Sequence, residues 1–264
     1  MGFASLWMGD HLLYRFPGEE ERGLWEVFSM LSALAAVTTR ITLGSLVACT
    51  SFRSPALLAK IAETIDEISG GRLILGLGAG WHQAEYEAFG YPFDHLAGRF
   101  EEALQVIVPL LRQGRVDFQG HYYQVQNCVL RPRGPSPSGP PLWIGTDGPR
   151  MLQLVARYAD GWNTAWHTDP TAVKERSQAV KSACKAVGRD PTSLVLTAGV
   201  RVRLSSTDED TPPAEAISGS PEAIASQLQS FAEVGITHLI VALEPKSLAG
   251  IERFAHIVEL LHQK

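Results

Sequence analysis

Short apolar runs alternate with longer amphipathic stretches along almost the whole chain. The runs place Val, Ile, Leu and Trp on nearly consecutive positions, which is typical of parallel strands buried on both faces. This pattern predicts strands at 3–10, 41–48, 72–78, 141–146, 161–166, 194–202 and 238–243.

The stretches between these strands repeat their apolar residues at the three-and-four spacing of a helix. Five such residues from Leu24 to Leu34 would form one buried helical face. Ser54 supplies an N-cap before Pro55, and Gly70 supplies a stop. Helices are therefore predicted at 24–39, 55–68, 98–113, 149–158, 170–187, 221–234 and 247–262.

Alternating strands and helices predict a parallel sheet with right-handed crossovers. Two stretches interrupt the rhythm. Residues 115–141 hold a predicted hairpin, "VDFQGHYYQV", and then a loop rich in Pro, Gly and Ser, whereas the polar and acidic residues 205–219 predict a mobile loop. The strand–helix pattern resumes after each, so we predict one domain over 1–264. Spacing alone leaves an open doubly wound sheet and a (β/α)8 barrel as alternatives.

Composition narrows the classes of partner. The chain is 45% hydrophobic and 19% charged, with a net charge of -5, which gives no electrostatic reason to expect nucleic acid. No apolar run reaches the ~18 residues of a membrane span, and the start lacks the features of a signal peptide. The three cysteines share no metal-ligand spacing. We therefore expect a cytoplasmic protein with no nucleic acid, membrane or metal partner.

The stretch "LILGLGAGWHQ" places three alternating glycines after a strand, which raises the question of a nucleotide-binding turn. The dinucleotide fingerprint G-x-G-x-x-G needs its third glycine where helix packs on strand, and Trp81 stands there instead. The fingerprint is thereby excluded. Two interpretations remain. Either the backbone at Gly78 and Gly80 passes close to a ligand with Trp81 and His82 beside it, or the turn is only tight and Trp81 belongs to the core.

Segments along nearly the whole chain resemble the luciferase-like monooxygenase superfamily, in the order found there. They are "LWMGDHLL", "ITLGSLVACTSFRSPALLAK", "SGGRLILGLGAGWHQAEYEAFGYPF", "RFEEALQVIVPLL", "PPLWIGTDGPRMLQLVARYADGWNTAW" and "GSPEAIASQLQSFAEVGITHLIV". The resemblance is closest to the branch that depends on the deazaflavin coenzyme F420. It implies a TIM-type (β/α)8 barrel with its cofactor at the carboxyl ends of the strands.

The start of the sequence departs from the family pattern. Family members have a strand and a helix before the equivalent of "GFASLWMGDH". We therefore expect a barrel that lacks its first strand and helix, unless the start lies further upstream. An open barrel would expose the edges of strands 3–8 and 238–243, and a partner chain could complete it.

The resemblance implies roles for residues at two strand ends. Asp10 and His11 would lie beside the redox-active ring, with His11 as the candidate for proton transfer, because imidazole titrates near neutral pH. The alternative for His11 is a surface histidine near a helix start. Leu46, Val47 and Ala48 would back the ring, with a non-prolyl cis peptide at Leu46–Val47. The alternative there is a plain buried strand.

The resemblance also implies contacts with the cofactor's side chain and phosphate. Ala79, Gly80 and Trp81 would lie along that part of the cofactor. A helix start would provide a second grip, because its unpaired N–H groups attract anions. Asp147 would repel a phosphate there unless it points away, and Arg150 could offset its charge. The residues of this grip are Gly145, Thr146, Asp147 and Gly148.

The implied substrate pocket is lined by Trp81, Trp166 and His167, with the loops at 115–141 and 205–219 as candidate lids. The implied reaction is hydride transfer between F420 and a small organic substrate, in a homodimer. Ala79 stands where FMN-binding luciferases place an arginine, which favours F420 over FMN. Two alternatives remain: an FMNH2-dependent monooxygenase, and a truncated, non-catalytic flavin-binding or subunit protein.

Overall fold

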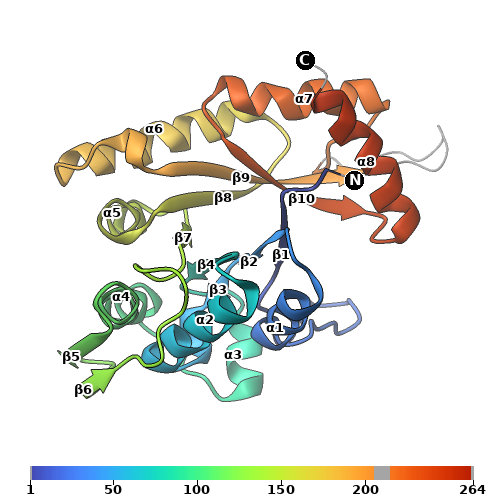
Figure 1. Ribbon diagram of the computed structural model, residues 1–264. Coiled ribbons are helices and arrows are strands. Elements are labelled where there is room, and N and C mark those ends of the chain that lie inside the picture. The colour runs from blue at the N-terminus through green and yellow to red at the C-terminus, as the bar shows by residue number, and fades with distance from the viewer. Residues whose placement is uncertain (1, 205–214, 263–264) are drawn as a thin grey trace. The chain divides into compact units, whose positions relative to one another are not determined.

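The computed structural model describes residues 2–204 and 215–262, which belong to two compact units (Figure 1). The first unit is Ser5–Gly145, and the second combines the first four residues with Thr146–Lys264. Each unit contains parallel strands and helices. The two are described in turn.

The first unit is built on a parallel sheet whose strands follow the order β1, β2, β4, β7, with β3 beside the end of β4. Most side chains of β2, β3, β4 and β7 are buried, as their continuous apolar runs predict. One predicted strand, 41–48, is divided into β2 and β3 at the Leu46–Val47 peptide. That peptide is cis, which confirms the prediction. The strands are β1 (Ser5–Met8), β2 (Thr42–Ser45), β3 (Ala48–Cys49), β4 (Leu73–Gly78) and β7 (Leu142–Gly145).

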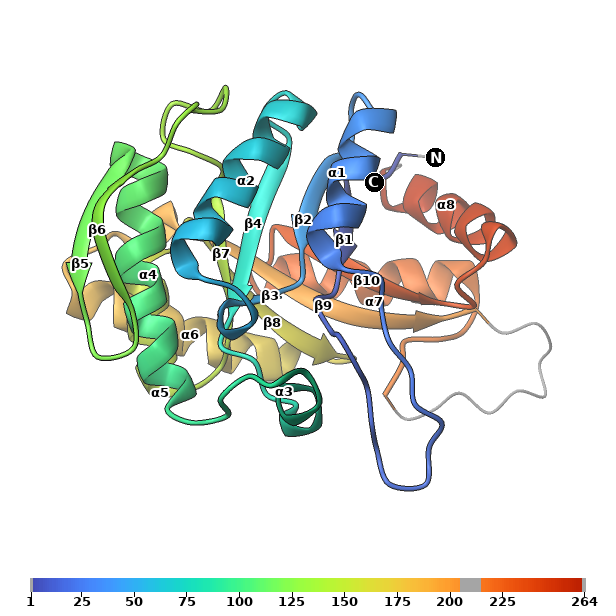
Figure 2. The same ribbon diagram turned by 90° about the horizontal axis from the view of Figure 1, so that it is seen from below.

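Three helices of this unit, α1 (Val27–Val37), α2 (Pro55–Ser69) and α4 (Leu96–Gln113), stand side by side against the sheet (Figure 2). The short helix α3 (Gln83–Phe89), absent from the prediction, follows β4, and a 3-10 turn, Thr50–Phe52, precedes α2.

Two details of the helix starts differ from the prediction. Leu24 lies before α1 and is 43% exposed, because the helix begins only after Glu26. The Glu26 carboxylate accepts the N–H groups of Phe28 and Ser29 and so caps α1. Ser54 does hold the N-cap position of α2, but within the described part of the chain its hydroxyl accepts no capping hydrogen bond.

The interruption at 115–141 contains the predicted hairpin, formed by β5 (Arg115–Gln119) and β6 (Gln124–Val129). The loop that follows leads into the start of β7 and packs against the C-terminal parts of α2 and α4. Arg133 pairs there with Glu63 at 3.0 Å. Residues 131–141 therefore lie at the amino ends of the strands, and their prediction as a lid over the carboxyl ends is wrong.

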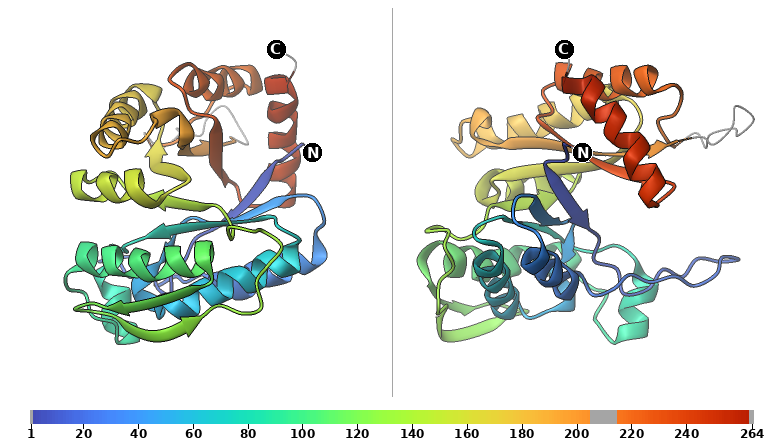
Figure 3. Two further views of the ribbon diagram at one scale, coloured as in Figure 1. Left: turned by 60° about the vertical axis from the view of Figure 1, so that its left-hand side comes forward. Right: turned by 45° about the vertical axis from the view of Figure 1, so that its right-hand side comes forward.

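The second unit has the parallel strands β8 (Gly161–His167), β9 (Val195–Arg203) and β10 (His238–Glu244) in that order. Helix α6 packs on β8 and α8 on β10, while α5 lies against α6 and α7 against α8. The start of the chain belongs here, and Figure 3 shows it running beside α8. Phe3 stacks there on Phe254 of α8, with ring centroids 6.2 Å apart. The helices are α5 (Pro149–Tyr158), α6 (Pro170–Ala186), α7 (Pro221–Glu233) and α8 (Leu248–His262), with a 3-10 turn at Pro191–Ser193.

The predicted mobile loop at 205–219 falls mostly outside the described residues, which resume at Glu215. Just beyond that point, Ile217 forms a parallel bridge with Val202 of β9. Among the described residues no helix is both long and apolar enough to cross a membrane.

Candidate functional site

The carboxyl ends of the strands in the first unit meet around Val47. Asp10, just after β1, accepts the N–H of Cys49 at 2.9 Å and so ties the ends of β1 and β3 together. A Cβ atom on Gly78 or Gly145 would lie only 2.6 or 2.9 Å from the Val47 side chain. Glycine is therefore required at the ends of β4 and β7, which close directly on Val47.

The turn after β4 is held by a buried chain of hydrogen bonds. The Tyr86 hydroxyl donates its proton to the Ala79 carbonyl at 2.8 Å. The Cys49 thiol lies 2.9 Å from the Tyr86 hydroxyl oxygen and is therefore the donor in that contact. Burial raises the pKa of the Cys49 thiol to about 11 and also raises the pKa of Tyr86, so both groups keep their protons at neutral pH. This chain fixes the backbone just before Gly80.

Replacing Gly80 with alanine is expected to destabilise the protein by about 3–5 kcal/mol, because left-handed backbone and overpacking add their costs. Gly80 has φ +82°, and its added Cβ would lie 1.9 Å from the Tyr86 hydroxyl. Gly90→Ala is the matched control, since Gly90 has φ +76° but no heavy atom of the described chain within 4 Å of such a Cβ. That variant should lose only about 1–2 kcal/mol. Urea unfolding measures both losses, and equal losses would contradict the close packing at Gly80.

The Asp10 carboxylate is committed to protein partners. Arg53 donates to its two oxygens at 2.6 and 3.0 Å, and the Asp10 and Arg53 side chains are only 1% and 11% exposed. Arg53 also donates to Glu26 at 2.6 Å and lies over the Phe28 ring. Asp10 therefore fixes the strand end that carries His11. Because its carboxylate pairs with Arg53, any contact of Asp10 with a cofactor would be made by its backbone atoms.

His11 lies at this strand end with its two ring nitrogens in different environments. Its Nδ1 is 3.0 Å from the Glu85 carboxylate of α3, and Glu85 is 1% exposed. The ring lies against Tyr14, with centroids 4.4 Å apart, and is edge-on to Trp81 at 5.6 Å. The His11 side chain is 18% exposed, so it is not a surface histidine. Because Nδ1 faces the carboxylate, Nε2 is the ring nitrogen that can form a hydrogen bond with a ligand.

Trp81 is 58% exposed, so its interpretation as a core residue is wrong. Phe16 lies nearly parallel to it, with centroids 6.4 Å apart, in the segment that joins β1 to α1. His82 secures that segment by accepting the N–H of Arg15 at 3.1 Å. Figure 2 shows this segment and α3 at the same end of the unit, where β4 ends. The aromatic cluster is the group of contacting rings formed by His11, Tyr14, Phe16, Trp81 and His82.

In the second unit, Asp147 is part of a polar group with Thr164 and His167. The Thr164 hydroxyl donates to Asp147 at 2.7 Å, so it accepts from His167 Nε2, 2.8 Å away. Burial, together with nearby Arg176, lowers the pKa of His167 and keeps its ring neutral at neutral pH. Asp147 also forms an ion pair with Arg176, a partner that the sequence did not suggest.

The other predicted residues of the second unit lie at the ends of β8 and before α5. Gly148 is the N-cap of α5 and has no side chain, so the first turn of the helix is accessible to an anion. The Thr146 backbone N–H donates to the Asn163 carbonyl, and its C=O accepts the Trp162 indole N–H. Trp166 is 41% exposed and has the Arg201 guanidinium 5.6 Å from its ring.

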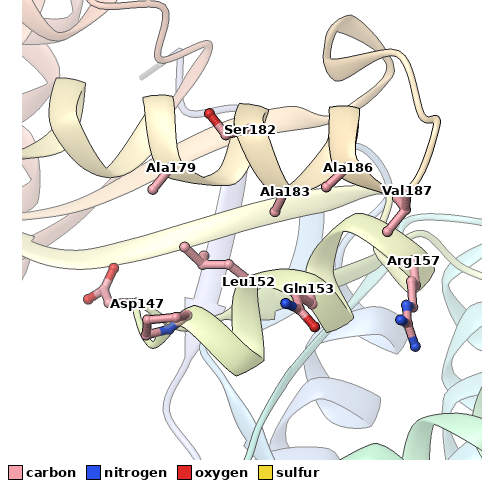
Figure 4. A pocket seen from close by; sticks show the side chains of 10 residues that line it. Asp147, Leu152, Gln153, Arg157, Ala179, Ser182, Ala183, Ala186 and Val187 are labelled. Atoms are coloured by element: carbon pink, nitrogen blue, oxygen red, sulfur yellow. The ribbon is translucent and has the colours of Figure 1, made fainter.

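A groove of about 460 Å³ lies between α5 and α6 (Figure 4). Small side chains such as Ala179 and Ala183 of α6 face Leu152 of α5 across it. Of the predicted site residues only Asp147 borders it. The groove is a gap in helix packing, and we assign it no function.

Parallel strands joined by helices define an α/β protein. Barrel proteins of this class generally bind their ligands at the carboxyl ends of the strands, where aromatic and ionisable side chains gather in this chain. Residues 1–212 match the family model of the luciferase-like monooxygenases. The chain belongs to this family, which confirms the resemblance seen in the sequence.

Individual relatives agree with this assignment. The chain is 32% identical over 212 residues to a phthiodiolone/phenolphthiodiolone dimycocerosates ketoreductase of Mycobacterium bovis, covering 74% of this chain and 55% of that protein. It is 37% identical over 160 residues to a 5,10-methylenetetrahydromethanopterin reductase of Archaeoglobus fulgidus, covering 61% and 44%. The chain thus spans about half the length of these curated relatives.

The fold is shown by a solved F420-dependent secondary alcohol dehydrogenase in complex with an F420–acetone adduct. The TM-score is 0.84 at 18% identity, and the match covers 98% of this chain and 91% of the other. This likeness confirms the predicted TIM-type barrel fold. The absence of a first strand and helix, and a single domain over 1–264, stay predictions.

Sequence reasoning missed Glu85, Arg53 and Arg176. Nothing in the sequence separates Glu85, which is buried, from Glu87, which lies two residues further on and is exposed. Arg53 follows a strand end that the resemblance had already singled out, and its position there was the only available signal.

Proposed function

We propose that this protein is an F420-dependent oxidoreductase that interconverts a ketone and a secondary alcohol. The observation that carries the proposal is His11, whose Nδ1 is held 3.0 Å from the buried Glu85 carboxylate beside exposed Trp81. Such a pair can give or take a proton at Nε2, which ketone reduction requires. The names of the ketoreductase relative and of the dehydrogenase with an F420–acetone adduct point to the same substrate class.

The strand ends of the first unit fit a planar tricyclic ring. No side chain can extend from Gly78 or Gly145 where they meet Val47, so these ends offer backbone and one aliphatic side chain. Leu46, Val47 and Ala48 would back the ring, and the turn that Tyr86 holds would run along the cofactor's side chain. That turn consists of Ala79, Gly80 and Trp81.

Further binding residues belong to the proposal as well. The helix start of α5 would receive the cofactor's phosphate through Gly145, Thr146, Asp147 and Gly148. Asp147, already paired with Arg176, would not present an uncompensated charge to it. Trp166 and His167 would join Trp81 in lining the substrate pocket.

When bound, the reduced deazaflavin supplies a hydride, the electron pair that with one proton converts a ketone to an alcohol while the deazaflavin is oxidised. His11 provides that proton from Nε2 in reduction and accepts it from the alcohol hydroxyl in oxidation. Trp81 and Phe16 cover the apolar part of the substrate and exclude water. Asp10 and Arg53 hold the strand end at which His11 acts.

Titration with F420 and, separately, with FMN tests the cofactor, with quenching of cofactor fluorescence as the readout. We expect quenching of F420, and loss of deazaflavin absorbance when F420 is supplied with an apolar secondary alcohol. Tight FMN binding without F420 binding would favour an FMNH2-dependent monooxygenase, the second candidate, which family membership supports. Binding of a cofactor without turnover of any alcohol or ketone would support a non-catalytic flavin-binding protein.

The assembly and location of the protein are also part of the proposal. Members of the family commonly associate through surface helices, so we propose a homodimer that acts on a small molecule in the cytoplasm. Native mass spectrometry tests the homodimer, and a monomer at working concentration would contradict it.

A further inference from the structure

We propose that Glu85 is the positioning residue for His11: it sets which ring nitrogen carries the proton and holds Nε2 toward the substrate. The inference rests on the proposed function for its catalytic meaning. Its structural content, the protonation pattern of one imidazole, is independent of any cofactor.

Glu85 is placed to fix both the ring and the backbone of the segment after β1. Its Oε1 faces His11 Nδ1 at 3.0 Å, and its Oε2 accepts the N–H of Leu12 at 2.9 Å. The Leu13 N–H points to the same Oε2 at 3.5 Å. With Glu85 1% exposed, water does not compete for these contacts. One carboxylate thus determines where the imidazole lies and how it is rotated.

The pairing determines the tautomer of His11. An ionised carboxylate only accepts hydrogen bonds, so the neutral ring must carry its proton on Nδ1. Nε2 is then left with a lone pair that can accept the proton of an alcohol hydroxyl. In the direction of ketone reduction both nitrogens are protonated, and the positive charge of the ring lies next to Glu85. A buried carboxylate plays the same role behind the histidine of serine hydrolases.

Substitution by glutamine reverses this arrangement while almost preserving the shape of the side chain. The Leu12 N–H needs an oxygen acceptor, which keeps the amide oxygen at the position of Oε2. The amide NH2 group then takes the position of Oε1 and donates to His11 Nδ1. Because Nδ1 must now accept, the neutral ring carries its proton on Nε2 and can no longer accept a proton there.

The first test reads the tautomer directly in the cofactor-free protein. Imidazole nitrogen chemical shifts are measured by NMR in mildly alkaline solution, and the His11 signals are identified by their absence in His11→Gln. We expect the proton on Nδ1 in the wild type and in Glu87→Gln, and on Nε2 in Glu85→Gln. Glu87 is the matched control because it lies on the same helix but is exposed, and its carboxylate accepts a hydrogen bond from Gln83 on the helix surface. A wild-type ring protonated on Nε2, or an unchanged tautomer in Glu85→Gln, overturns the inference.

The second test is kinetic. Glu85→Gln should lower kcat for alcohol oxidation by about a hundredfold or more, with KM within about threefold of the wild type, because the proton acceptor is lost and the binding surface is not. Glu87→Gln should match the wild type in both constants. Wild-type kcat in Glu85→Gln would overturn the catalytic meaning of the inference. Failure of the proposed function would look different from failure of this inference. The wild type would then neither bind F420 nor oxidise alcohols, while the NMR measurement would still find the His11 proton on Nδ1 in the wild type and on Nε2 in Glu85→Gln.

Discussion

The His11→Ala variant is expected to turn over at least about a hundredfold more slowly than the wild type, the usual contribution of a general acid or base. The Nε2 atom that would exchange a proton with the substrate is lost, whereas the strand ends that would back the cofactor ring are kept. F420 affinity should therefore stay within a few-fold of the wild type. Steady-state kinetics and fluorescence titration measure the two quantities separately.

His256→Ala provides the control for this variant. His256 lies on α8, is 60% exposed and pairs only loosely with Glu259 at 3.7 Å. Its loss should change neither turnover nor F420 affinity. Unchanged turnover in His11→Ala would remove His11 from the mechanism, and an equal loss in both variants would point to a general effect of removing a histidine.

The Arg53→Met variant is expected to lose about 3–5 kcal/mol of stability, because it leaves the Asp10 carboxylate buried without its cation. The Asp10 and Arg53 side chains are 1% and 11% exposed, and two hydrogen bonds join them. Methionine keeps most of the apolar length of the side chain, so the loss reports mainly on the charge. Denaturant unfolding monitored by tryptophan fluorescence gives the free energy of unfolding.

Arg22→Met is the matched control, since Arg22 forms an ion pair with Glu19 in which both side chains are more than half exposed. An exposed pair of this kind contributes about 0–1 kcal/mol. If Arg53→Met cost no more than Arg22→Met, the Asp10–Arg53 pair would not be what holds the end of β1. Restoration of stability by the double variant Asp10→Asn with Arg53→Met would show that the unpaired charge was the cause.

Much of the fold followed from local patterns. The apolar runs located the parallel strands, and the three-and-four spacing located α1, α2 and α4 to α8 to within a few residues. Both kinds of periodicity arise from burial of one face or two, which a sequence records directly. The short helix α3 was not predicted, because its seven residues are too few to show a period.

The candidate site was predictable only in part. Resemblance to a family pointed to His11, Val47 and Gly80, because their segments are distinctive in sequence. It could not show that the Asp10 carboxylate is taken up by Arg53, or that Asp147 pairs with Arg176. Each of these pairs joins residues separated by 29 or 43 positions. No periodicity connects such distant positions.

The sequence by itself determined the alternation of strands and helices and the family. It also excluded the dinucleotide fingerprint, because Trp81 stands where the third glycine of that motif is needed. Only the tertiary structure decided which polar side chains meet, and above all that Glu85 rather than Glu87 lies behind His11. The physical reason is that the register of a helix is a local property, whereas burial and charge pairing depend on what the rest of the chain brings alongside. Two glutamates on one short helix are equivalent until the end of β1 is placed against one of them.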